Sequence, residues 1–562
     1  MRTLFTIVAA ILLIPCLSFS QHEMLVGGIA SAGYLNDVIL GDTLAGGVRA
    51  DSSRVYVLMR DSTYLVQTLI RNNGWTLRIK SNYGGVHPPV IYNWPNIITG
   101  AYPAAVIEAH GDLYITGVAM VGWAQPLPTA SLSPNAANII LMNSLGLTLQ
   151  VDSCMFVAGK SATIQTSVAL HKLQVTNTLF AQSGNLYATN IGNGRPIDFR
   201  NVSCDTAIVQ NCTMIDGTDR IVRHYASTGA LDYFKFDHNT VVNDMAMHGC
   251  LGLGIVGHRV IITNNVFVDN FALGNDSTDA VRLAEFGDTK ERGPSGAYHM
   301  YFVGSVPPDS IADSLGLAKI TGQWTVSGNY YSVTPALQTW YDTHASAGLG
   351  NLLPLSQYIR KQLGADSTNA FVKETITMTH PTRNLVPFCT WYWDTSSVGG
   401  DKQKRNNGFN AAVDFYRPAW TYYKDTLNLA YQTSAAAYTG AWGGFPSGDL
   451  NWYPTRKAAW LLTGVEPIGS KKIPNSFSLH QNYPNPFNPS TKITFDLPQN
   501  GNVVLKVFNL LGQEVATLIN DSRMAAGTHE YIFDASTLSS GVYFYTLTSG
   551  TQFASKKMLL LK

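Results

Sequence analysis

Four oxygen-bearing side chains in the middle of the chain recur at a spacing that could bind a metal ion. They are Asp216, Asn243, Asp244 and Asp269. If successive turns of the chain stack on one another, three of these side chains line up one turn apart, and Asp244 lies next to them. Calcium takes roughly six to eight oxygen ligands, so this acidic column could supply part of a calcium site. The alternative is that Asp and Asn end strands here because both residues favour turns.

Basic residues that follow Asp216 in the chain could complete a catalytic site. In such a site, calcium neutralises an acidic polysaccharide while Arg223, Lys290 or Arg292 removes a proton from the sugar. Hydrolysis of a glycosidic bond instead needs clustered carboxylates that act as general acid and base. Residues 275–279, with the sequence Asn-Asp-Ser-Thr-Asp, imitate such a cluster poorly, and we expect them to form a solvated loop.

A six-residue pattern between about residues 110 and 335 would position these side chains. Each copy has an apolar residue, a polar residue, a turn former, a small or amide residue, any residue and a second apolar residue. Copies begin at Ile115, Val151, Val175, Val209, Phe236, Ile262 and Val326. The period is about 25 to 35 residues with insertions, which is typical of a solenoid and less typical of propeller blades.

The pattern predicts a right-handed parallel β-helix, in which each coil lays short strands on those of the coil before it, about 4.8 Å away. The two apolar places then point into one continuous core. The third place needs a residue that accepts a tight or left-handed turn, as Asn, Gly, Ser and His do. At the fourth place, Asn239, Asn265 and Asn329 would stack as a ladder of amides.

The cysteines do not form a disulfide framework. Those beyond residue 20 are Cys154, Cys204, Cys212, Cys250 and Cys389. Two of them, Cys154 and Cys212, share the fourth place of the repeat but lie two coils apart. About 9.6 Å would separate them, which is too far for a disulfide. The sequence also contains no Cys-x-x-Cys pair that would suggest a zinc or redox site.

We assign residues 21–465 to the β-helix, with an irregular, aromatic-rich part from about residue 335. Within this part, residues 354–374 are expected to form a helical excursion from the coils. Seven of the 11 tryptophans also lie there. Aromatic residues at this density either cap the end of the solenoid or form a surface on which sugars stack. Exposed side chains of Trp391, Trp393 or Trp420 would favour binding of a glycan.

Residues 1–20 contain a basic residue, an apolar run and a small-x-small triplet, which together are typical of a secretory signal peptide. The run is shorter than the ~20 residues that span a bilayer, and no other segment is apolar for long enough. We therefore expect no transmembrane segment in the mature chain. Lys and Arg number 38 against 37 Asp and Glu. Without an excess of positive charge to bind phosphates, the composition argues against nucleic acid as a partner.

The end of the chain predicts a separate domain. Residues 466–473 break the repeat and are expected to be a linker. Residues 474–562 then contain short alternating strands separated by turn signals. This arrangement predicts a small antiparallel β-sandwich.

Three motifs of this domain resemble a known export signal. YPNPFNPST at 483–491, VFNLLGQEVATL at 507–518 and AGTHEYIFDASTLSSGVYFYTL at 526–547 are similar, in this order, to the type A C-terminal sorting domain of the type IX secretion system. The resemblance implies recognition by that secretion machinery, export through the outer membrane, and a secreted or surface location. It does not imply what the exported body does.

The coils resemble the pectate-lyase-like superfamily of β-helices. Asp237 and His238 are similar to the Asp-His pair of pectate lyases. Arg292 and Pro294 match the start of an Arg-x-Pro-x-x-Arg motif, although Ala297 stands where the second Arg belongs. Asp237 and His238 also fit an ordinary corner of the repeat. Two classes of function stay open: a polysaccharide lyase or hydrolase, and a noncatalytic surface protein for adhesion or structural support.

Overall fold

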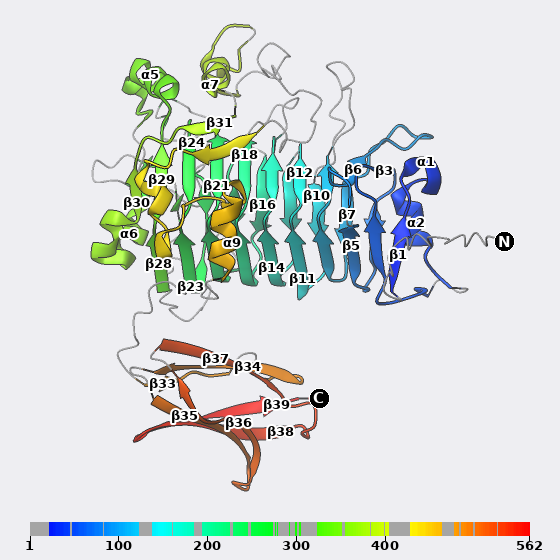
Figure 1. Ribbon diagram of the computed structural model, residues 1–562, viewed down its shortest axis with the longest axis vertical. Coiled ribbons are helices and arrows are strands. Elements are labelled where there is room, and N and C mark those ends of the chain that lie inside the picture. The colour runs from blue at the N-terminus through cyan, green and yellow to red at the C-terminus, as the bar shows by residue number, and fades with distance from the viewer. Residues whose placement is uncertain are drawn as a thin grey trace, which may run out of the picture. The chain divides into compact units, whose positions relative to one another are not determined.

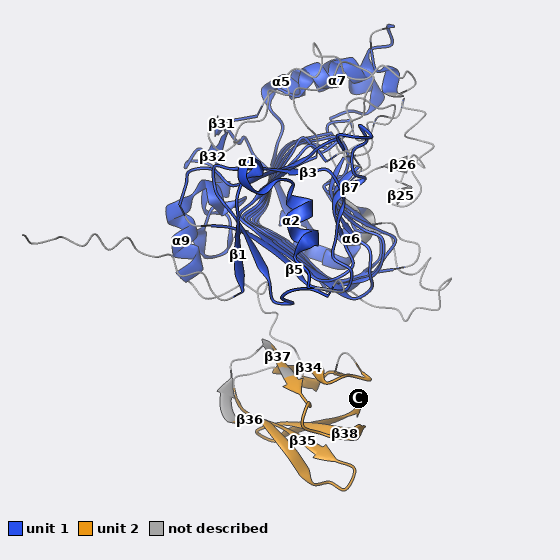
Figure 2. Cartoon of the chain, turned by 90° about the vertical axis from the view of Figure 1, so that its right-hand side faces the viewer, with its two compact units in different colours: residues 1–462 blue, residues 463–562 orange. Residues whose placement is uncertain are grey.

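The computed structural model contains two compact units, residues 1–462 and residues 463–562 (Figure 2). The structure describes residues 22–44, 48–82, 84–122, 138–159, 161–184, 194–224, 229–245, 249–273, 276, 278, 291–292, 298–299, 303–304, 323–350, 354–382, 384–397, 399–403, 427–462, 477–482, 485–497, 501–524 and 527–561. The predicted signal peptide at 1–20 and the predicted linker at 466–473 lie outside the described residues.

Three long parallel sheets form the body of the first unit (Figure 1). Sheet 1 contains, in spatial order, β1 (Glu23–Val26), β2 (Val55–Leu58), β5 (Leu77–Ser81), β8 (Leu113–Thr116), β11 (Leu147–Asp152), β14 (Leu170–Thr176), β17 (Cys204–Gln210), β20 (Leu231–Asp237), β23 (Val256–Thr263) and β28 (Gln323–Ser327). Sheet 2 contains β3 (Thr63–Val66), β6 (Val90–Asn93), β9 (Ala119–Val121), β12 (Met155–Val157), β15 (Leu179–Ala181), β18 (Thr213–Gly217), β21 (Thr240–Asp244), β24 (Val266–Asn270), β29 (Asn329–Ser332) and β30 (Phe371–Lys373). Sheet 3 contains β4 (Ile70–Arg71), β7 (Ala105–Ala109), β10 (Asn138–Met142), β13 (Ala162–Thr166), β16 (Arg195–Arg200), β19 (Val222–His224), β22 (Leu251–Gly252) and β27 (Val303–Gly304).

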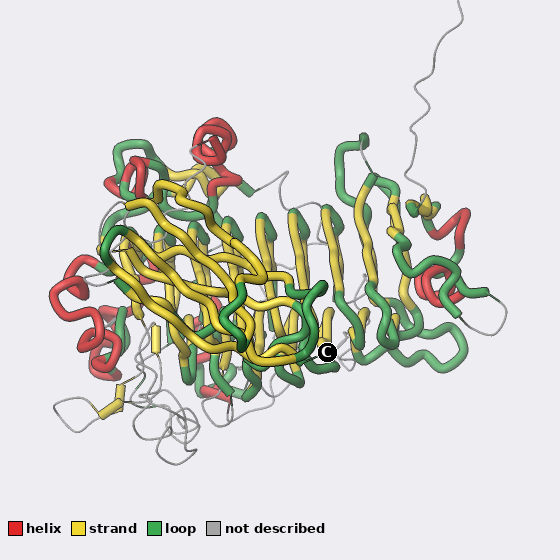
Figure 3. Tube along the Cα trace, turned by 90° about the horizontal axis from the view of Figure 1, so that it is seen from below, coloured by secondary structure: helices red, strands yellow, loops and turns green. Residues whose placement is uncertain are grey.

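The chain passes through the three sheets in turn, so that strands of successive coils lie side by side (Figure 3). This arrangement confirms the predicted parallel β-helix. A separate antiparallel pair, β25 (Glu291–Arg292) and β26 (Tyr298–His299), lies between β24 and β27 in the chain.

The six-residue repeats stack as predicted. Along sheet 1, the first place of each repeat pairs with the first place of the next, as Val151 does with Val175 and Val175 with Val209. Along sheet 2, the sixth places pair in the same way, as Phe156 does with Phe180. The rings of these two phenylalanines stack with their centroids 5.3 Å apart, in a core that continues through the coils. The apolar places of the repeat therefore build the core.

The corner between sheets 1 and 2 contains the predicted amide ladder. The third place of the repeat has a left-handed backbone there, with φ of 52° at Asn211 and 58° at Asn264. At the fourth place, the side-chain oxygen of Asn265 accepts a hydrogen bond from the backbone N–H of Asn239 at 2.8 Å. The side-chain oxygen of Asn329 accepts one from the backbone N–H of Asn265 at 3.1 Å. The ladder thus gives buried N–H groups of the corner a partner in the next coil.

Helices cover both ends of the core. At the N-terminal end, α1 (Ile29–Ala32) precedes α2 (Leu35–Gly41), which buries Leu35 and Ile39. At the other end, α6 (Gln357–Leu363) and η2 (Gly364–Asn369) form the predicted helical excursion and bury Ile359. Both ends of a solenoid would otherwise expose apolar side chains, so such caps keep the protein soluble.

The aromatic-rich part packs mainly against itself and the coils. It contains α5 (Pro335–Thr343), η1 (Ala345–Ala347), α7 (Val386–Trp393) and η3 (Asp401–Gln403). Trp340 and Trp391 are buried in one cluster with Met245 and Leu273 from the coils. Trp393 is half-buried, and its ring meets that of Trp340 edge to face, with the centroids 5.9 Å apart. These tryptophans are packing residues that lie beside the coils, whereas α6 and η2 cover the end of the core. Trp420 lies outside the described residues.

Residues 427–462, which we call the strap, lie along the outside of the coils. The strap contains β32 (Asn428–Tyr431), η4 (Ala436–Thr439), η5 (Trp442–Gly444), η6 (Leu450–Trp452) and α9 (Pro454–Leu462). Its strand β32 pairs with β31 (Met378–His380). Leu429 and Tyr431 of the strap are buried against the outer face of sheet 2, together with Val242 and Val268. The strap therefore covers an apolar face that would otherwise be exposed.

The strap contacts the third place of five successive repeats. Ser447 Oγ donates to the carbonyl of Gly328 at 2.9 Å, and the N–H of Gly448 donates to the carbonyl of Asn264 at 2.7 Å. The other contacts are the ring of Trp460 on His238, with the centroids 5.4 Å apart, Asn451 Nδ2 donating to the carbonyl of Asn211 at 2.9 Å, and Lys457 Nζ donating to Asn177 Oδ1 at 2.6 Å. The turn residues of the repeat therefore also bind the strap.

Glycine is required where the strap approaches the coils most closely. Gly448 has a left-handed φ of 91°, and a Cβ added there would lie 2.6 Å from Thr240 Oγ1. The next residue, Asp449, is buried and accepts a hydrogen bond from Thr213 Oγ1 at 2.7 Å. Its N–H donates to Thr240 Oγ1 at 2.8 Å. The buried carboxyl group of Asp449 thus lies at the centre of the contact between strap and coils.

Docking of the strap should depend on pH through Asp449. Burial raises the pKa of Asp449 to about 6 from its ordinary value of 3.8. Because the folded state binds this proton more tightly than the unfolded state, stability should fall as pH rises from about 4 to about 6, by at most about 1.4 kcal/mol per pH unit. Hydrogen exchange of the strap amides across this range measures the effect. Asp449→Asn, which cannot titrate, should remove the Asp449 contribution; an unchanged slope in this variant would contradict the assignment.

The second unit is a two-sheet antiparallel sandwich. One sheet contains β33 (Ser478–Leu479), β34 (Ser490–Leu497) and β37 (Gly527–Asp534), and the other contains β36 (Glu514–Met524), β35 (Gly501–Asn509), β38 (Gly541–Ser549) and β39 (Gln552–Leu560). Ile493, Phe495, Leu505, Val507 and Tyr545 are fully buried in its core. Strands such as β34 alternate buried and partly exposed residues, as expected for a sandwich.

Candidate functional site

The predicted acidic column lies at the corner between sheets 2 and 3. Asp216, Asn243 and Asp269 occupy equivalent places in β18, β21 and β24, since the residues on either side of them are paired. All three have a left-handed backbone, with φ of 56°, 56° and 51°. Asp and Asn accept this conformation more readily than most residues. The alignment predicted from the sequence is correct, and the backbone conformation explains why these residue types recur.

The side chains of the column bind protein groups. Asn243 Nδ2 donates to Asp216 Oδ1 at 3.1 Å and to Thr382 Oγ1 at 2.7 Å. The two oxygens of Asp269 accept from the N–H of Thr334 at 2.7 Å and from its Oγ1 at 2.6 Å. Burial raises the pKa of Asp269, although these hydrogen bonds oppose the shift. The column therefore links neighbouring coils and the N-terminus of α5.

Asp244, which follows Asn243 in β21, is fully buried. Its Oδ1 lies so close to Gly217 that a Cβ added at this glycine would be 2.8 Å from it. Cys250 Sγ lies 3.6 Å from Oδ2. Among the described residues, no three His, Cys, Asp or Glu side chains lie close enough together to hold a metal ion.

The calcium site stays a prediction, and a calcium titration of the whole protein tests it. We expect the turn role to prevail, because the oxygens of Asp269 already have partners. The titration should then give no saturable heat, and Asp216→Ala should cost about 1 kcal/mol of stability. Saturable heat with a stoichiometry near one, weakened by Asp216→Ala and Asp269→Ala but not by Asp152→Ala, would establish the calcium site instead.

Of the basic residues proposed beside the column, only the side chain of Arg223 is described. Arg223 lies in β19 of sheet 3, and its Nε donates to Asp198 Oδ1 at 2.8 Å. Arg292 lies in β25, where side chains are outside the description. Lys290, Pro294 and Ala297 lie outside the described residues, as do Asn275 and Asp279 of the predicted solvated loop. Asp276 of that loop is buried and pairs with Lys402 at 2.8 Å.

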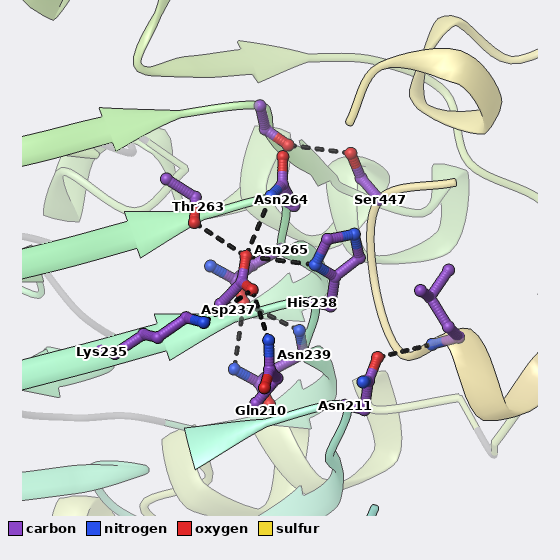
Figure 4. Close-up of polar contacts among 12 residues, drawn as sticks. Gln210, Asn211, Lys235, Asp237, His238, Asn239, Thr263, Asn264, Asn265 and Ser447 are labelled. Atoms are coloured by element: carbon purple, nitrogen blue, oxygen red, sulfur yellow. Dashed lines mark hydrogen bonds and ion pairs between the residues drawn. The ribbon is translucent and has the colours of Figure 1, made fainter. Parts of the chain in front are cut away.

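Asp237 and His238 form a closed corner of the repeat (Figure 4). Asp237 Oδ1 accepts hydrogen bonds from Thr263 Oγ1 at 2.7 Å and from Asn264 Nδ2 at 2.9 Å, and its Oδ2 accepts one from Gln210 Nε2 at 2.8 Å. His238 Nδ1 lies 3.1 Å from Oδ1. His238 is also fully buried. This geometry agrees with the alternative that the pair is an ordinary corner of the repeat.

Ionic contacts keep Asp237 charged in spite of its burial. Lys235 Nζ lies 3.6 Å from Asp237 Oδ2. Burial by itself would raise the pKa of Asp237, but the interactions with His238 and Lys235 and the hydrogen bond from Thr263 lower it well below the ordinary range. A buried carboxylate with this many partners stabilises the stack of coils and is closed to a substrate.

Sheet 3 has a row of mostly polar side chains on its outer face, which the sequence did not reveal. The row follows the register of all eight strands: Arg71, Glu108, Leu141, Gln165, Asp198, Arg223, Gly252 and Gly304. Glu108 lies between the core residues Ile107 and Ala109 in the chain, so its side chain points outward. A row with charged residues at four of eight places differs from the outer face of sheet 2, which is apolar under the strap.

Sheet 3 and its flanking residues also contain two buried ion pairs. Arg223 and Asp198 belong to the row, and Arg195 at the start of β16 pairs with Asp219 at 2.7 Å. Burial lowers the pKa of Arg195, although Asp219 opposes the shift. Arginine offers a planar fork of donors that matches a carboxylate, so these residues are of a type that could bind an acidic group once it replaced their present partner.

The second unit resembles a known family. Residues 481–561 match the family model described as a secretion system C-terminal sorting domain. The tail is a type IX sorting domain. The sorting domain implies interaction with the type IX machinery and secretion or surface display of the attached β-helix. A search of curated proteins and a search of solved structures each found no significant match. No helix within the described ranges has the length and apolar character needed to span a membrane.

Proposed function

We propose that this exported β-helix protein binds or breaks down acidic polysaccharide along the outer row of sheet 3. The observation that carries the proposal is the row itself, in which residues from Arg71 to Arg223 lie at one register position of successive strands. Strands of neighbouring coils are about 4.8 Å apart, so the row is a linear array of polar groups. A long polymer of charged sugars matches such an array better than a compact ligand does.

Substitution of Gln165, near the middle of the row, changes the charge of the row and tests whether that charge contributes to binding. It is half-exposed and points outward, since its neighbours Ile164 and Thr166 are fully buried. Gln165→Lys should strengthen, and Gln165→Glu should weaken, the retention of the protein on gels that contain polygalacturonate or alginate, by about threefold to tenfold each. The matched control is Gln174→Glu, because Gln174 is also half-exposed but points outward from sheet 1.

The reaction is tested with the same polymers. A lyase yields unsaturated products that absorb in the ultraviolet, and a hydrolase yields new reducing ends without that absorbance. Loss of the products on addition of a chelator would indicate a metal-dependent lyase. If neither Gln165 variant changes retention and no polymer is cleaved, the proposal fails.

The alternative function is a noncatalytic surface protein for adhesion or structural support. Burial of the ion pairs favours it, because the side chains of Asp198 and Arg223 are 0% and 3% exposed and already satisfy one another. Under this alternative, no polymer is cleaved and the Gln165 variants leave retention unchanged.

A further inference from the structure

Three side chains near the carboxyl ends of β7 and β10, in sheet 3, are linked to one another by hydrogen bonds. Ser144 Oγ lies 3.1 Å from His110 Nδ1, and His110 Nε2 lies 2.8 Å from Glu108 Oε1. A hydroxyl, an imidazole and a carboxylate in this order are the parts of a serine nucleophile with its general base and an orienting acid. Such an arrangement is recognised by its geometry and not by the order of the residues in the chain.

The β-helix brings the three residues together from two coils. Glu108 points outward from β7, and His110 follows two residues later, just beyond the end of that strand. Ser144 follows β10 of the next coil, two residues after Met142. The backbone of His110 is fixed, since its N–H donates to Asn72 Oδ1 at 2.9 Å and its carbonyl accepts from the N–H of Gly74 at 3.2 Å. Stacking of the coils therefore positions the serine beside the imidazole.

Glu108 is held as a carboxylate. Its Oε2 accepts a hydrogen bond from Arg71 at 2.7 Å, and its Oε1 accepts one from Asn143 Nδ2 at 2.8 Å. Although burial opposes the shift, hydrogen bonds from Arg71, Asn143 and His110 lower the pKa of Glu108 to about 2. A charged Glu108 favours the imidazole tautomer that carries its proton on Nε2. Nδ1 is then the free base that faces the Ser144 hydroxyl.

The imidazole is accessible to a ligand. The side chain of His110 is 27% exposed, whereas that of Glu108 is 11% exposed. Ser144 is half-buried and lies in a turn of the chain. By contrast, the Asp-His pair at Asp237 and His238 is fully enclosed. Exposure falls from the base to the orienting carboxylate, which is the order that a hydrolytic site needs.

We propose that Ser144, His110 and Glu108 form a serine hydrolase site that cleaves small carboxylic esters. Ser144 Oγ bonds to the carbonyl carbon of the ester while its proton passes to His110 Nδ1. The bond between that carbon and the alcohol oxygen breaks, and the alcohol leaves with the proton from His110. Water then gives its oxygen to the acyl carbon and a proton to His110, the bond to Ser144 Oγ breaks, and the serine regains its proton as the acid leaves.

Glu108 is a positioning residue in this scheme, because it touches the imidazole and not the ester. It stabilises the imidazolium that forms in each half of the reaction. The site does not depend on the function proposed above for the outer row of sheet 3. If both proposals hold, the ester is an acyl group on the polysaccharide.

A fluorophosphonate probe tests the nucleophile directly in the full chain. We expect one phosphonyl adduct, located on Ser144 by peptide mass mapping, and labelling at least ~100-fold slower in His110→Gln. Ser144→Ala should lose the adduct and reduce the hydrolysis of p-nitrophenyl acetate by the same factor. The control is Ser153→Ala, because Ser153 is exposed and bonds to a carboxylate, Asp152, at 2.8 Å without a histidine. This variant should keep both activities.

Substitution of Glu108 separates a positioning role from a merely structural one. Glu108→Gln should lower kcat with little change in KM, and Glu108→Asp should restore part of kcat. Absence of a Ser144 adduct in the folded wild-type protein, or equal labelling of wild type and His110→Gln, would overturn the proposal. Failure of polysaccharide binding would not affect these results, because neither probe contains a sugar.

Discussion

Deletion of residues 474–562 should leave a folded protein that stays in the periplasm of a host with the type IX system. Residues 481–561 form the sorting domain that this machinery recognises. The β-helix should not need them to fold, because its cores are built from residues up to Tyr453 and the core of the sandwich from residues 477–560. Surface proteolysis and cell fractionation, compared between full-length and truncated protein, measure the effect.

The expected change is a loss of nearly all surface display with an unchanged melting temperature of the β-helix. A fusion of residues 463–562 to an unrelated exported protein is the matching gain-of-function control. Equal display of the truncated protein would remove the role of the tail in export. A truncated protein that unfolds would instead show that the coils depend on the tail.

The largest effect of a single substitution on stability is expected at Asp237. Asp237→Ala removes a buried carboxylate that lies beside Lys235 and that accepts hydrogen bonds from Thr263, Asn264 and Gln210. Removal of one member of a buried, hydrogen-bonded ion pair costs about 3–5 kcal/mol. Chemical denaturation of the purified protein should show a loss of this size.

Asp152 provides a control at the same place of an earlier repeat. It accepts hydrogen bonds from Thr176 Oγ1 at 2.6 Å and Asn177 Nδ2 at 2.7 Å, which match the bonds from Thr263 and Asn264 to Asp237. It is half-exposed, and no ion pair to it is found among the described residues. Asp152→Ala should therefore cost only about 1 kcal/mol. Equal losses in the two variants would mean that the buried charges add nothing to the stability of the corner.

The fold could be predicted from the sequence because its physics is local and periodic. The first and sixth places of the repeat are apolar in every copy, and this alone sets the register in which Val151 meets Val175 and Phe156 meets Phe180. The amides of Asn239, Asn265 and Asn329 could be aligned for the same reason. A property that repeats once per coil can be recognised in the amino-acid sequence alone.

The partners of the site residues could not be predicted because they come from distant parts of the chain. Thr382 contacts Asn243, Thr334 contacts Asp269, and Trp460 contacts His238. None of these partners belongs to the six-residue repeat, so the period of the repeat does not reveal them. Glu108 and His110 are two residues apart, and this spacing could have drawn attention to them. Ser144 comes within hydrogen-bond distance of His110 only because a later coil stacks on the coil that contains His110.

The strap also determines how the molecule responds to tension. It lies between the coils and the C-terminal tail in the chain, so a force applied through the tail reaches the strap before it reaches β30. The strap is held to the coils at five points from Gly328 back to Asn177, and these contacts have to break before tension passes along the chain to β30. A protein held at a cell surface by its tail would thus resist pulling without losing coils from its C-terminal end.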